Sequence, residues 1–301
     1  MYLQRAQEFF TFQYDFVAYA LGASVLVGVV CGLVGSFLVL RGFSLMGDAI
    51  GHATLPGVAA AFLVVGHQHP AALLTGALVS AVIAALTVGV FSRGPRVRSD
   101  AAIGIVLSVF FGIGIVLLAF IQASATGMQA GLTQFLFGNA AAITGPQLQV
   151  LAVIGVVLCV LIGLYYRPLA LLVFDEGFAR SVGIKTTRLE VGLLAALSVA
   201  VVISIQAVGV ILVAAMLIIP PSTGRFLAGR LPGVIVWSMS LGGLSGALGA
   251  FISYVFEGVA TGPAMVLVAT VFFGLALVFG PRGGLLWQVR LPGARRSREA
   301  L

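Results

Sequence analysis

The sequence carries very little charge. Only 8% of its 301 residues are Asp, Glu, Lys or Arg, whereas a soluble domain of this size typically has about a quarter. With 60% hydrophobic residues and a mean hydropathy of +1.17, the apolar side chains cannot all be buried in one core. Lipid must therefore solvate much of the surface, and we expect an integral membrane protein.

Cysteine is scarce as well, and no nucleotide-binding loop is present. Cys31 and Cys159 both lie within apolar runs and have no CxxC pattern, which argues against a disulfide framework or a thiolate metal site. The sequence contains no G-x-x-x-x-G-K-[ST] motif, so any ATP hydrolysis is expected from a separate subunit and not from this chain. The net charge of +7 comes from short arginine clusters between apolar runs, so nucleic acid is not an expected partner.

Long apolar runs predict an all-α polytopic membrane protein. Each crossing needs about 20 apolar residues, and nine stretches are long enough. Eight is the alternative count, because 190–228 is nearly continuous and is divided only at Gln206 to Gly209. Continuous runs also argue against an alternating-strand barrel. The predicted spans are 17–40, 44–66, 71–91, 100–122, 146–166, 190–206, 208–228, 232–256 and 261–281.

The basic residues orient these spans. Nine crossings from an outer N-terminus put 15 of the 16 basic residues on the cytosolic side and leave only Arg5 outside. Such a one-sided distribution follows the positive-inside rule. We therefore expect an N-terminal interfacial segment at 1–16, a transmembrane domain at 17–281 and a basic cytosolic tail at 282–301.

Two connections are unusually long. Residues 123–145 lie outside in this topology and are too apolar for a solvated loop, which predicts a short helix or re-entrant piece buried against protein. Residues 167–189 lie on the cytosolic side. There Asp175 can cap a short helix and Gly183 can end it. A helix outside the bilayer needs a surface against which to dock.

Ionisable residues inside a span are functional candidates, and few occur here. In the run GDAIGHATLPG, Asp48 and His52 are four residues apart, on one face of a helix. A carboxylate and an imidazole suit Mn²⁺, Fe²⁺ or Zn²⁺. Pro56 cannot donate a hydrogen bond to the His52 carbonyl, which predicts a kinked helix with a free oxygen. The alternative is a pair that hydrogen-bonds internally or to a neighbouring helix and serves packing.

Three further features are candidates for the path. His67 and His69 lie at the outer end of the second span and form either an entrance site for metal or a solvated loop pair. Glu257, at the outer end of the eighth span, either lines the mouth or contacts a binding protein, or is an exposed loop carboxylate. Pro220 and Pro221 are expected to end their span, as a gate that frees carbonyls or as a simple helix terminus.

Together these segments resemble the metal-transporting ABC-3 permease family, whose members import manganese, zinc or iron. The resemblance covers roughly residues 17–281. Near Glu257 the sequence departs from the Asp-x-Pro-Ser-Gly-like turn expected in that family. The resemblance depends on LVLRGFSLMGDAIGHATLPGVAAAF at 38–62, FLFGN at 135–139, DEGFARSVGI at 175–184, ILVAAMLIIPPSTGRFL at 211–227 and SYVFEGVATGPAMVL at 253–267.

The resemblance implies a permease fold similar to that of the vitamin B12 and siderophore importers, in the cell membrane of a prokaryote. It implies a homodimer, two cytosolic ATP-binding subunits and an extracytoplasmic metal-binding protein. Asp48 and His52 match the family's intramembrane metal pair, with the divalent metal as cargo and no permanent cofactor. The matching residues of the ATPase coupling element are Asp175, Glu176, Phe178, Ala179, Arg180 and Gly183.

Three other functions are compatible with parts of the sequence. In a secondary transporter, Asp48 would carry a proton and His52 would be its partner, and no ATPase would be needed. An ABC permease for a large metal chelate would need a wide lumen and would have less use for this pair. A structural membrane scaffold gives no reason for an intramembrane Asp near a proline. Ligand type alone does not separate Mn²⁺, Zn²⁺ and Fe²⁺.

Overall fold

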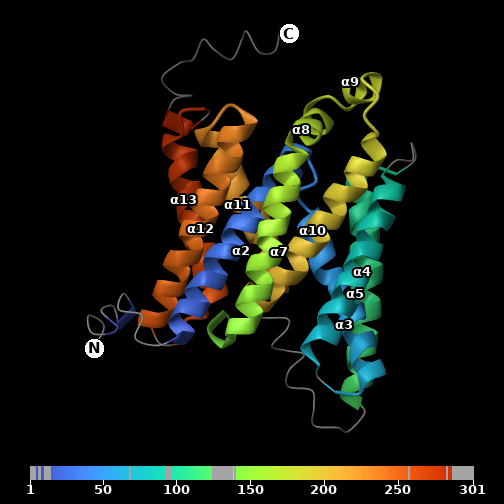
Figure 1. The fold of residues 1–301 in the computed structure, drawn as a ribbon, viewed down its shortest axis with the longest axis vertical. Helices are drawn as coiled ribbons and strands as arrows, with labels where there is room; N and C mark the ends of the chain where they lie inside the picture. Colours follow the sequence, from blue (N-terminus) through green and yellow to red (C-terminus); the bar gives the residue numbers. More distant parts are fainter. Residues whose placement is uncertain are drawn as a thin grey trace.

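The computed structural model is a bundle of long helices (Figure 1). It describes residues 5, 8, 9, 15–67, 69–92, 97–123, 138, 140–256, 258–282 and 284–286. Within these residues all regular structure is helical, as predicted. The long helices are α2 (Asp15–Leu40), α3 (Met46–Val65), α4 (Pro70–Phe91), α5 (Ser99–Ala123), α7 (Gly145–Leu164), α10 (Thr186–Val208), α11 (Val210–Leu227), α12 (Leu231–Val255) and α13 (Thr261–Phe279). The short ones are η1 (Ala140–Ala142), α8 (Tyr166–Phe174) and α9 (Glu176–Ser181).

The described part of the chain contains nine helices long and apolar enough to cross a membrane, which confirms nine spans and not eight. The division between α10 and α11 falls at Gly209, whose φ of 88° and ψ of 161° only glycine adopts readily. Helix α10 begins at Thr186, earlier than predicted, so Glu190 lies inside the helix and is buried. The span boundaries otherwise agree with the apolar runs to within a few residues.

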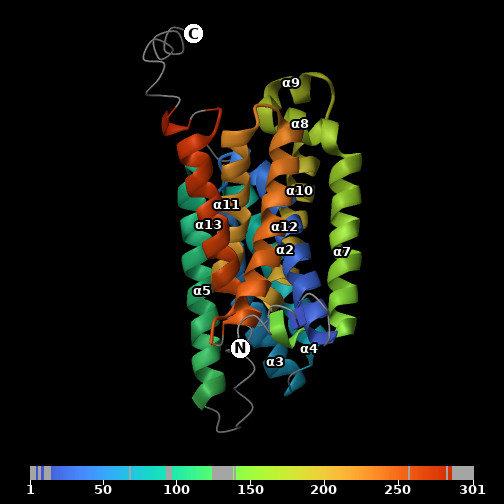
Figure 2. The ribbon, with the colours of Figure 1, turned by 90° about the vertical axis from the view of Figure 1, so that its left-hand side faces the viewer.

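Successive long helices alternate in direction, and α8 and α9 lie at one end of the bundle (Figures 1 and 2). The connections from α2 to α3 and from α11 to α12 lie at this same end and contain Arg41 and Arg230. Arg180 is in α9, Lys185 is in the turn that follows, and Arg188 is in the first turn of α10. The positive-inside rule therefore assigns this end to the cytosol.

Helix α2 lies within the bundle (Figure 2) and packs against α12 through facing small residues. A side chain at Gly28 would collide with the carbonyl of Gly242, and one at Gly246 with the backbone of Ser24. Small residues spaced in this way let membrane helices approach closely, because dispersion contacts replace the missing hydrophobic drive between helices in lipid. Helix α3 packs against α4 in the same way: a side chain at Gly57 would collide with the carbonyl of Gly76.

The expectation that Pro220 and Pro221 end their span is wrong. Both prolines are buried inside α11, which continues to Leu227. Prolines are tolerated inside membrane helices where neighbouring groups satisfy the carbonyls that lose their donors. Gly35 of α2 lies so close that an added side chain would meet the Leu217 carbonyl and the Pro221 ring. Whether the prolines act as a gate stays a prediction.

Several predicted segments fall partly outside the described residues. The interfacial segment 1–16 and the tail 282–301 are described only in part, and Glu257 is not described. Of the connection 123–145, the structure describes Ala123, Gly138 and 140–145. Gly138 has a φ of 66° and packs against the backbone between α10 and α11.

We expect Gly28→Ala to lower thermal stability, because its new methyl group would overlap the Gly242 carbonyl. Overpacking of this kind costs about 1–3 kcal/mol. The measurement is the melting temperature of the detergent-purified protein. Gly112→Ala on α5 is the matched control, since nothing lies within 4 Å of its added carbon. Equal melting temperatures for the two variants would contradict the close contact between α2 and α12.

Candidate metal path and coupling site

The structure places Asp48 and His52 together on α3. Asp48 is in the first turn of the helix and His52 is one turn further. The distance from His52 Nε2 to Asp48 Oδ1 is 3.5 Å, and the side chains are 22% and 38% exposed, respectively. The two donors are therefore close enough to contact one ion and open enough for an ion to reach them. Both lie in the half of α3 nearer the cytosolic end.

The surroundings of His52 leave part of its ring without a polar partner. Phe111 of α5 packs edge to face against the ring, with centroids 5.0 Å apart. The Nδ1 atom is buried and has no hydrogen-bond partner among the described residues. A histidine that ligates a metal normally has a partner for its second nitrogen, which strengthens the bond to the metal. Metal bound through Nε2 would lack that support, which favours weak, reversible binding.

The backbone around the pair is adapted to the proline. Helix α3 is continuous from Met46 to Val65, with Pro56 inside it, so the helix is not broken there. Pro56 has no N–H to donate to the His52 carbonyl. The next carbonyl, that of Ala53, accepts a hydrogen bond of 2.6 Å from the Ser80 hydroxyl of α4. The His52 carbonyl oxygen is therefore the one that lacks its helical donor.

An alternative explanation for Asp48 is electrostatic. A carboxylate in the first turn stabilises a helix because it faces the positive end of the dipole, and Asp100 also lies in the first turn of α5. This explanation accounts for Asp48 alone. It gives no reason for a partly exposed imidazole one turn away, and the metal interpretation accounts for both residues.

The pair is not a complete metal site. Within the described part of the chain, no three His, Cys, Asp or Glu side chains form a cluster that could hold a metal ion. Mn²⁺, Zn²⁺ and Fe²⁺ need at least four ligands. Water, a backbone carbonyl or a second subunit must therefore supply the others.

The outer histidines are separate from this pair. His67 and His69 lie beyond the other end of α3, with ring centroids 6.1 Å apart. His67 Nδ1 is 3.0 Å from the Val65 carbonyl oxygen. The two rings are neighbours beyond the outer end of α3, away from Asp48 and His52. Glu257 lies outside the described residues, so the three entrance candidates remain predictions.

The predicted cytosolic helix is present as α9. Asp175 caps it, accepting a 2.8 Å hydrogen bond from the Phe178 N–H, and Gly183 follows with a φ of 84°. Ala179 is fully buried and fixes the helix to the bundle. Phe178 and Val182 are 53% and 59% exposed. They form a small apolar patch at the cytosolic end, which a partner would cover in an assembled complex.

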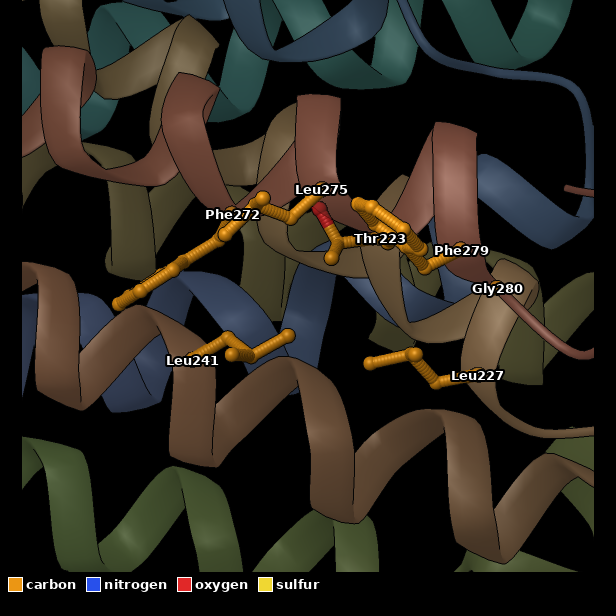
Figure 3. A pocket seen from close by; sticks show the side chains of 8 residues that line it. Thr223, Leu227, Leu241, Phe272, Leu275, Phe279 and Gly280 are labelled. Carbon is orange, nitrogen blue, oxygen red and sulfur yellow. The ribbon is translucent and has the colours of Figure 1, made fainter. Parts of the chain in front are cut away.

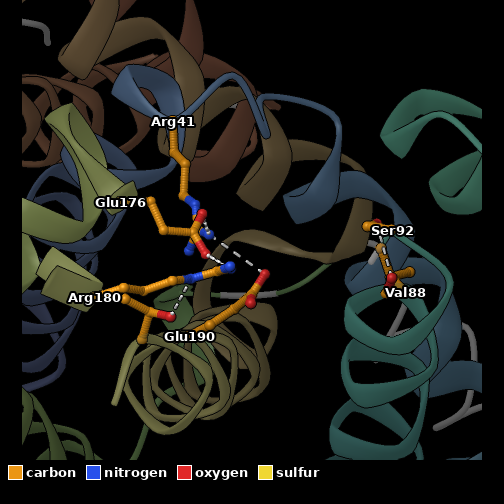
Figure 4. A network of polar contacts seen from close by, with 7 residues as sticks. Arg41, Val88, Ser92, Glu176, Arg180 and Glu190 are labelled. Atoms are coloured by element: carbon orange, nitrogen blue, oxygen red, sulfur yellow. Dashed lines mark hydrogen bonds and ion pairs between the residues drawn. The ribbon is translucent and has the colours of Figure 1, made fainter. Parts of the chain in front are cut away.

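A charged network beneath α9 is the part that sequence reasoning missed (Figure 4). Arg41 Nη2 lies 3.4 Å from Glu176 Oε2 and 3.5 Å from Glu190 Oε1. Arg180 Nη2 contacts Glu176 Oε1 at 2.5 Å, and its Nε donates to the Thr186 hydroxyl at 3.2 Å. The only signal in the sequence was Glu190 itself, an acidic residue at the start of an apolar run.

Two hollows lie away from the metal pair. The first, about 570 Å³, is on the cytosolic side and is lined by the charged network together with Phe43, Ser92 and Ser99. The second, about 350 Å³, is an open apolar groove between α11, α12 and α13 (Figure 3). Neither hollow contains Asp48 or His52. The candidate metal site is therefore identified by the ligand atoms of Asp48 and His52 and not by the size of a cavity.

A bundle whose described part contains nine candidate membrane helices, with a short helix at its cytosolic end, is the fold of a polytopic membrane protein. Residues 13–280 match the ABC 3 transport family, and the chain belongs to that family. It is a multi-pass protein of the plasma membrane. The family resemblance and the fold class expected from the sequence are confirmed.

Relatives match over nearly the whole chain. The manganese transport system membrane protein MntC of Bacillus subtilis (strain 168) is 42% identical over 291 residues, which cover 95% of this chain and 67% of that protein. The zinc transport system membrane protein TroC of Treponema pallidum (strain Nichols) is 38% identical, covering 92% of each chain. The solved structure of PsaBC from Streptococcus pneumoniae in complex with Fab has a TM-score of 0.82 and 33% identity, covering 96% of this chain and 100% of that one.

We expect Asp48→Asn to weaken Mn²⁺ binding to the purified protein by about tenfold or more. The amide keeps the shape of the side chain but removes the charge that attracts a hard cation. Equilibrium dialysis with radioactive Mn²⁺ measures the affinity. Asp100→Asn is the control, because Asp100 also lies in the first turn of a membrane helix. A similar affinity in wild type and both variants would mean that Asp48 is only a helix-start residue.

Proposed function

We propose that this chain is the membrane permease of an ATP-driven importer for a divalent transition metal, Mn²⁺, Zn²⁺ or Fe²⁺. The observation that carries the proposal is the Asp48–His52 pair, whose donor atoms lie 3.5 Å apart and partly exposed on one face of α3. The manganese and zinc transport proteins among its relatives support the same cargo class. Oxygen and nitrogen donors together suit all three ions.

The incomplete ligand set supports a homodimer. Two copies would bring two such pairs to a path between them, and four protein donors would replace much of the water shell of the ion. Weak binding is required here, because an ion that binds too tightly does not leave. The buried Nδ1 of His52, which has no described partner, is consistent with such weakness. An extracytoplasmic binding protein would deliver the ion to the outer mouth near His67 and His69.

The energy source would be two cytosolic ATP-binding subunits. The sequence has no phosphate-binding loop of its own, and α9 presents Phe178 and Val182 outward. A short helix of this kind can dock in a groove of each ATPase subunit. ATP binding and hydrolysis would move α9 and switch the path between outward and inward states. The subunit itself carries out no covalent chemistry.

A proton-coupled secondary transporter is the second candidate, since Asp48 could exchange a proton near His52. A secondary transporter needs no ATPase subunit, so it does not explain why α9 exposes apolar side chains. A permease for a large metal chelate is the third. It is disfavoured because a path for a bulky chelate needs a wide lumen and has less use for an Asp–His pair.

Uptake of metal into proteoliposomes tests the proposal. The permease is reconstituted with its ATPase and binding protein, and Mn²⁺, Zn²⁺ and Fe²⁺ are compared with and without ATP. We expect uptake that requires ATP and that falls to background in Asp48→Ala, because the dehydrating ion loses its charged ligand. Uptake that follows an imposed proton gradient without ATP would support the secondary transporter instead.

Phe178→Asp should prevent the permease from binding its ATPase. A charge on an apolar contact would have to be desolvated without a partner, which costs several kcal/mol. Co-purification of the two subunits measures the effect. Leu285→Asp is a matched control, since Leu285 is also an exposed apolar residue but follows α13, outside the docking helix. Retention of the ATPase by Phe178→Asp would show that α9 is not the docking element.

A further inference from the structure

Arg41 connects three parts of the chain that are distant in sequence. It lies at the end of α2, directly before the turn into α3, and contacts Glu176 of α9 and Glu190 of α10. We propose that Arg41 is a positioning residue that transmits movement of α9 to the start of the helix that carries Asp48 and His52. This inference rests on the proposed function, because α9 is taken to be the ATPase contact.

Backbone hydrogen bonds hold the turn after Arg41 together, so the turn can move as a unit. The Gly42 N–H donates to the Val39 carbonyl, and the Phe43 N–H donates to the Leu38 carbonyl at 2.9 Å. With Gly42 at a φ of 81°, these two bonds form a Schellman motif that ends α2. The Met46 N–H then donates to the Phe43 carbonyl at 3.0 Å. The chain between Arg41 and the first turn of α3 is therefore short and internally bonded.

Arg41 is almost fully buried, so its charge needs a carboxylate nearby. Its side chain is only 11% exposed, and that of Glu190 is 10% exposed. A guanidinium group can hold two carboxylates at once through its fork of N–H groups. It also lies over the Phe43 ring, 5.4 Å from the centroid, which ties the cation to the turn itself. Glu190 alone would compensate the charge, so the contact with Glu176 is not needed for neutrality.

The second carboxylate belongs to the docking helix and is shared. Glu176 is 36% exposed and contacts Arg180 of its own helix at 2.5 Å but Arg41 at 3.4 Å. The longer contact is the one that a small displacement of α9 can shorten or break. Such an exchange between two arginines provides two discrete arrangements, which is what a coupling element requires. The metal pair begins a few residues beyond the affected turn.

The test compares Arg41→Gln with Arg188→Gln in the reconstituted complex. Arg188 is an exposed residue in the first turn of α10, so Arg188→Gln removes the same charge at the same cytosolic end of the bundle. We expect Arg41→Gln to lower metal transported per ATP hydrolysed by about tenfold while the complex assembles and hydrolyses ATP, and Arg188→Gln to leave the ratio unchanged. Adding Glu176→Gln to Arg41→Gln should lower the ratio no further, since Arg41→Gln has already removed the contact between Arg41 and Glu176.

A labelling experiment separates this inference from the proposed function. Leu45, at the start of α3, is 57% exposed, and Leu45→Cys in a Cys159→Ser background reports on that position. ATP should change its rate of maleimide labelling in the assembled complex, and Arg41→Gln should abolish that response, whether or not metal is transported. An ATP response that persists in Arg41→Gln would overturn the proposal. So would a loss of thermal stability in Arg41→Gln with an unchanged ratio of transport to hydrolysis.

Discussion

The close packing of α2 against its neighbours is the constraint on which the rest of the structure depends. In lipid the hydrophobic effect does not drive helices together, so close contacts between small residues must hold the bundle together. Gly28 and Gly32 let the backbone of α12 approach, and Gly35 does the same for α11. With α2 fixed, the turn at its cytosolic end is fixed as well. That turn determines where Arg41 lies and where α3 begins.

Polar groups inside this packed bundle are few, and the structure treats them in two ways. Arg41 and Glu190 are almost fully covered and compensate each other, as buried charges must. Asp48 and His52 remain partly exposed and incompletely partnered. The first arrangement is what a structural or mechanical contact needs. The second suits a transient site for a dehydrating ion, because ligand atoms must be free of other hydrogen bonds and ion pairs before they can coordinate a metal.

Much of this could be predicted from the sequence because local patterns determine it. Apolar length gave the nine spans, i to i+4 spacing placed Asp48 beside His52, and Asp175 caps its helix as a residue before a short amphipathic run should. The network of Arg41 could not be predicted, since its partners are brought near only by tertiary packing. The prolines of α11 were misjudged for the same reason. Whether a helix continues through them depends on neighbours such as Gly35, which local sequence does not reveal.

Pulsed electron paramagnetic resonance of the Mn²⁺-loaded complex would show whether His52 binds the ion. Coupling between the electron spin of the ion and a nearby ¹⁴N nucleus reports a histidine ligand without reference to transport. We expect an imidazole ¹⁴N coupling that disappears in His52→Ala and persists in a variant that lacks His67 and His69. Mn²⁺ bound within the membrane domain without any ¹⁴N coupling, or with a coupling that survives His52→Ala, would contradict the assignment of Asp48 and His52 as the metal pair.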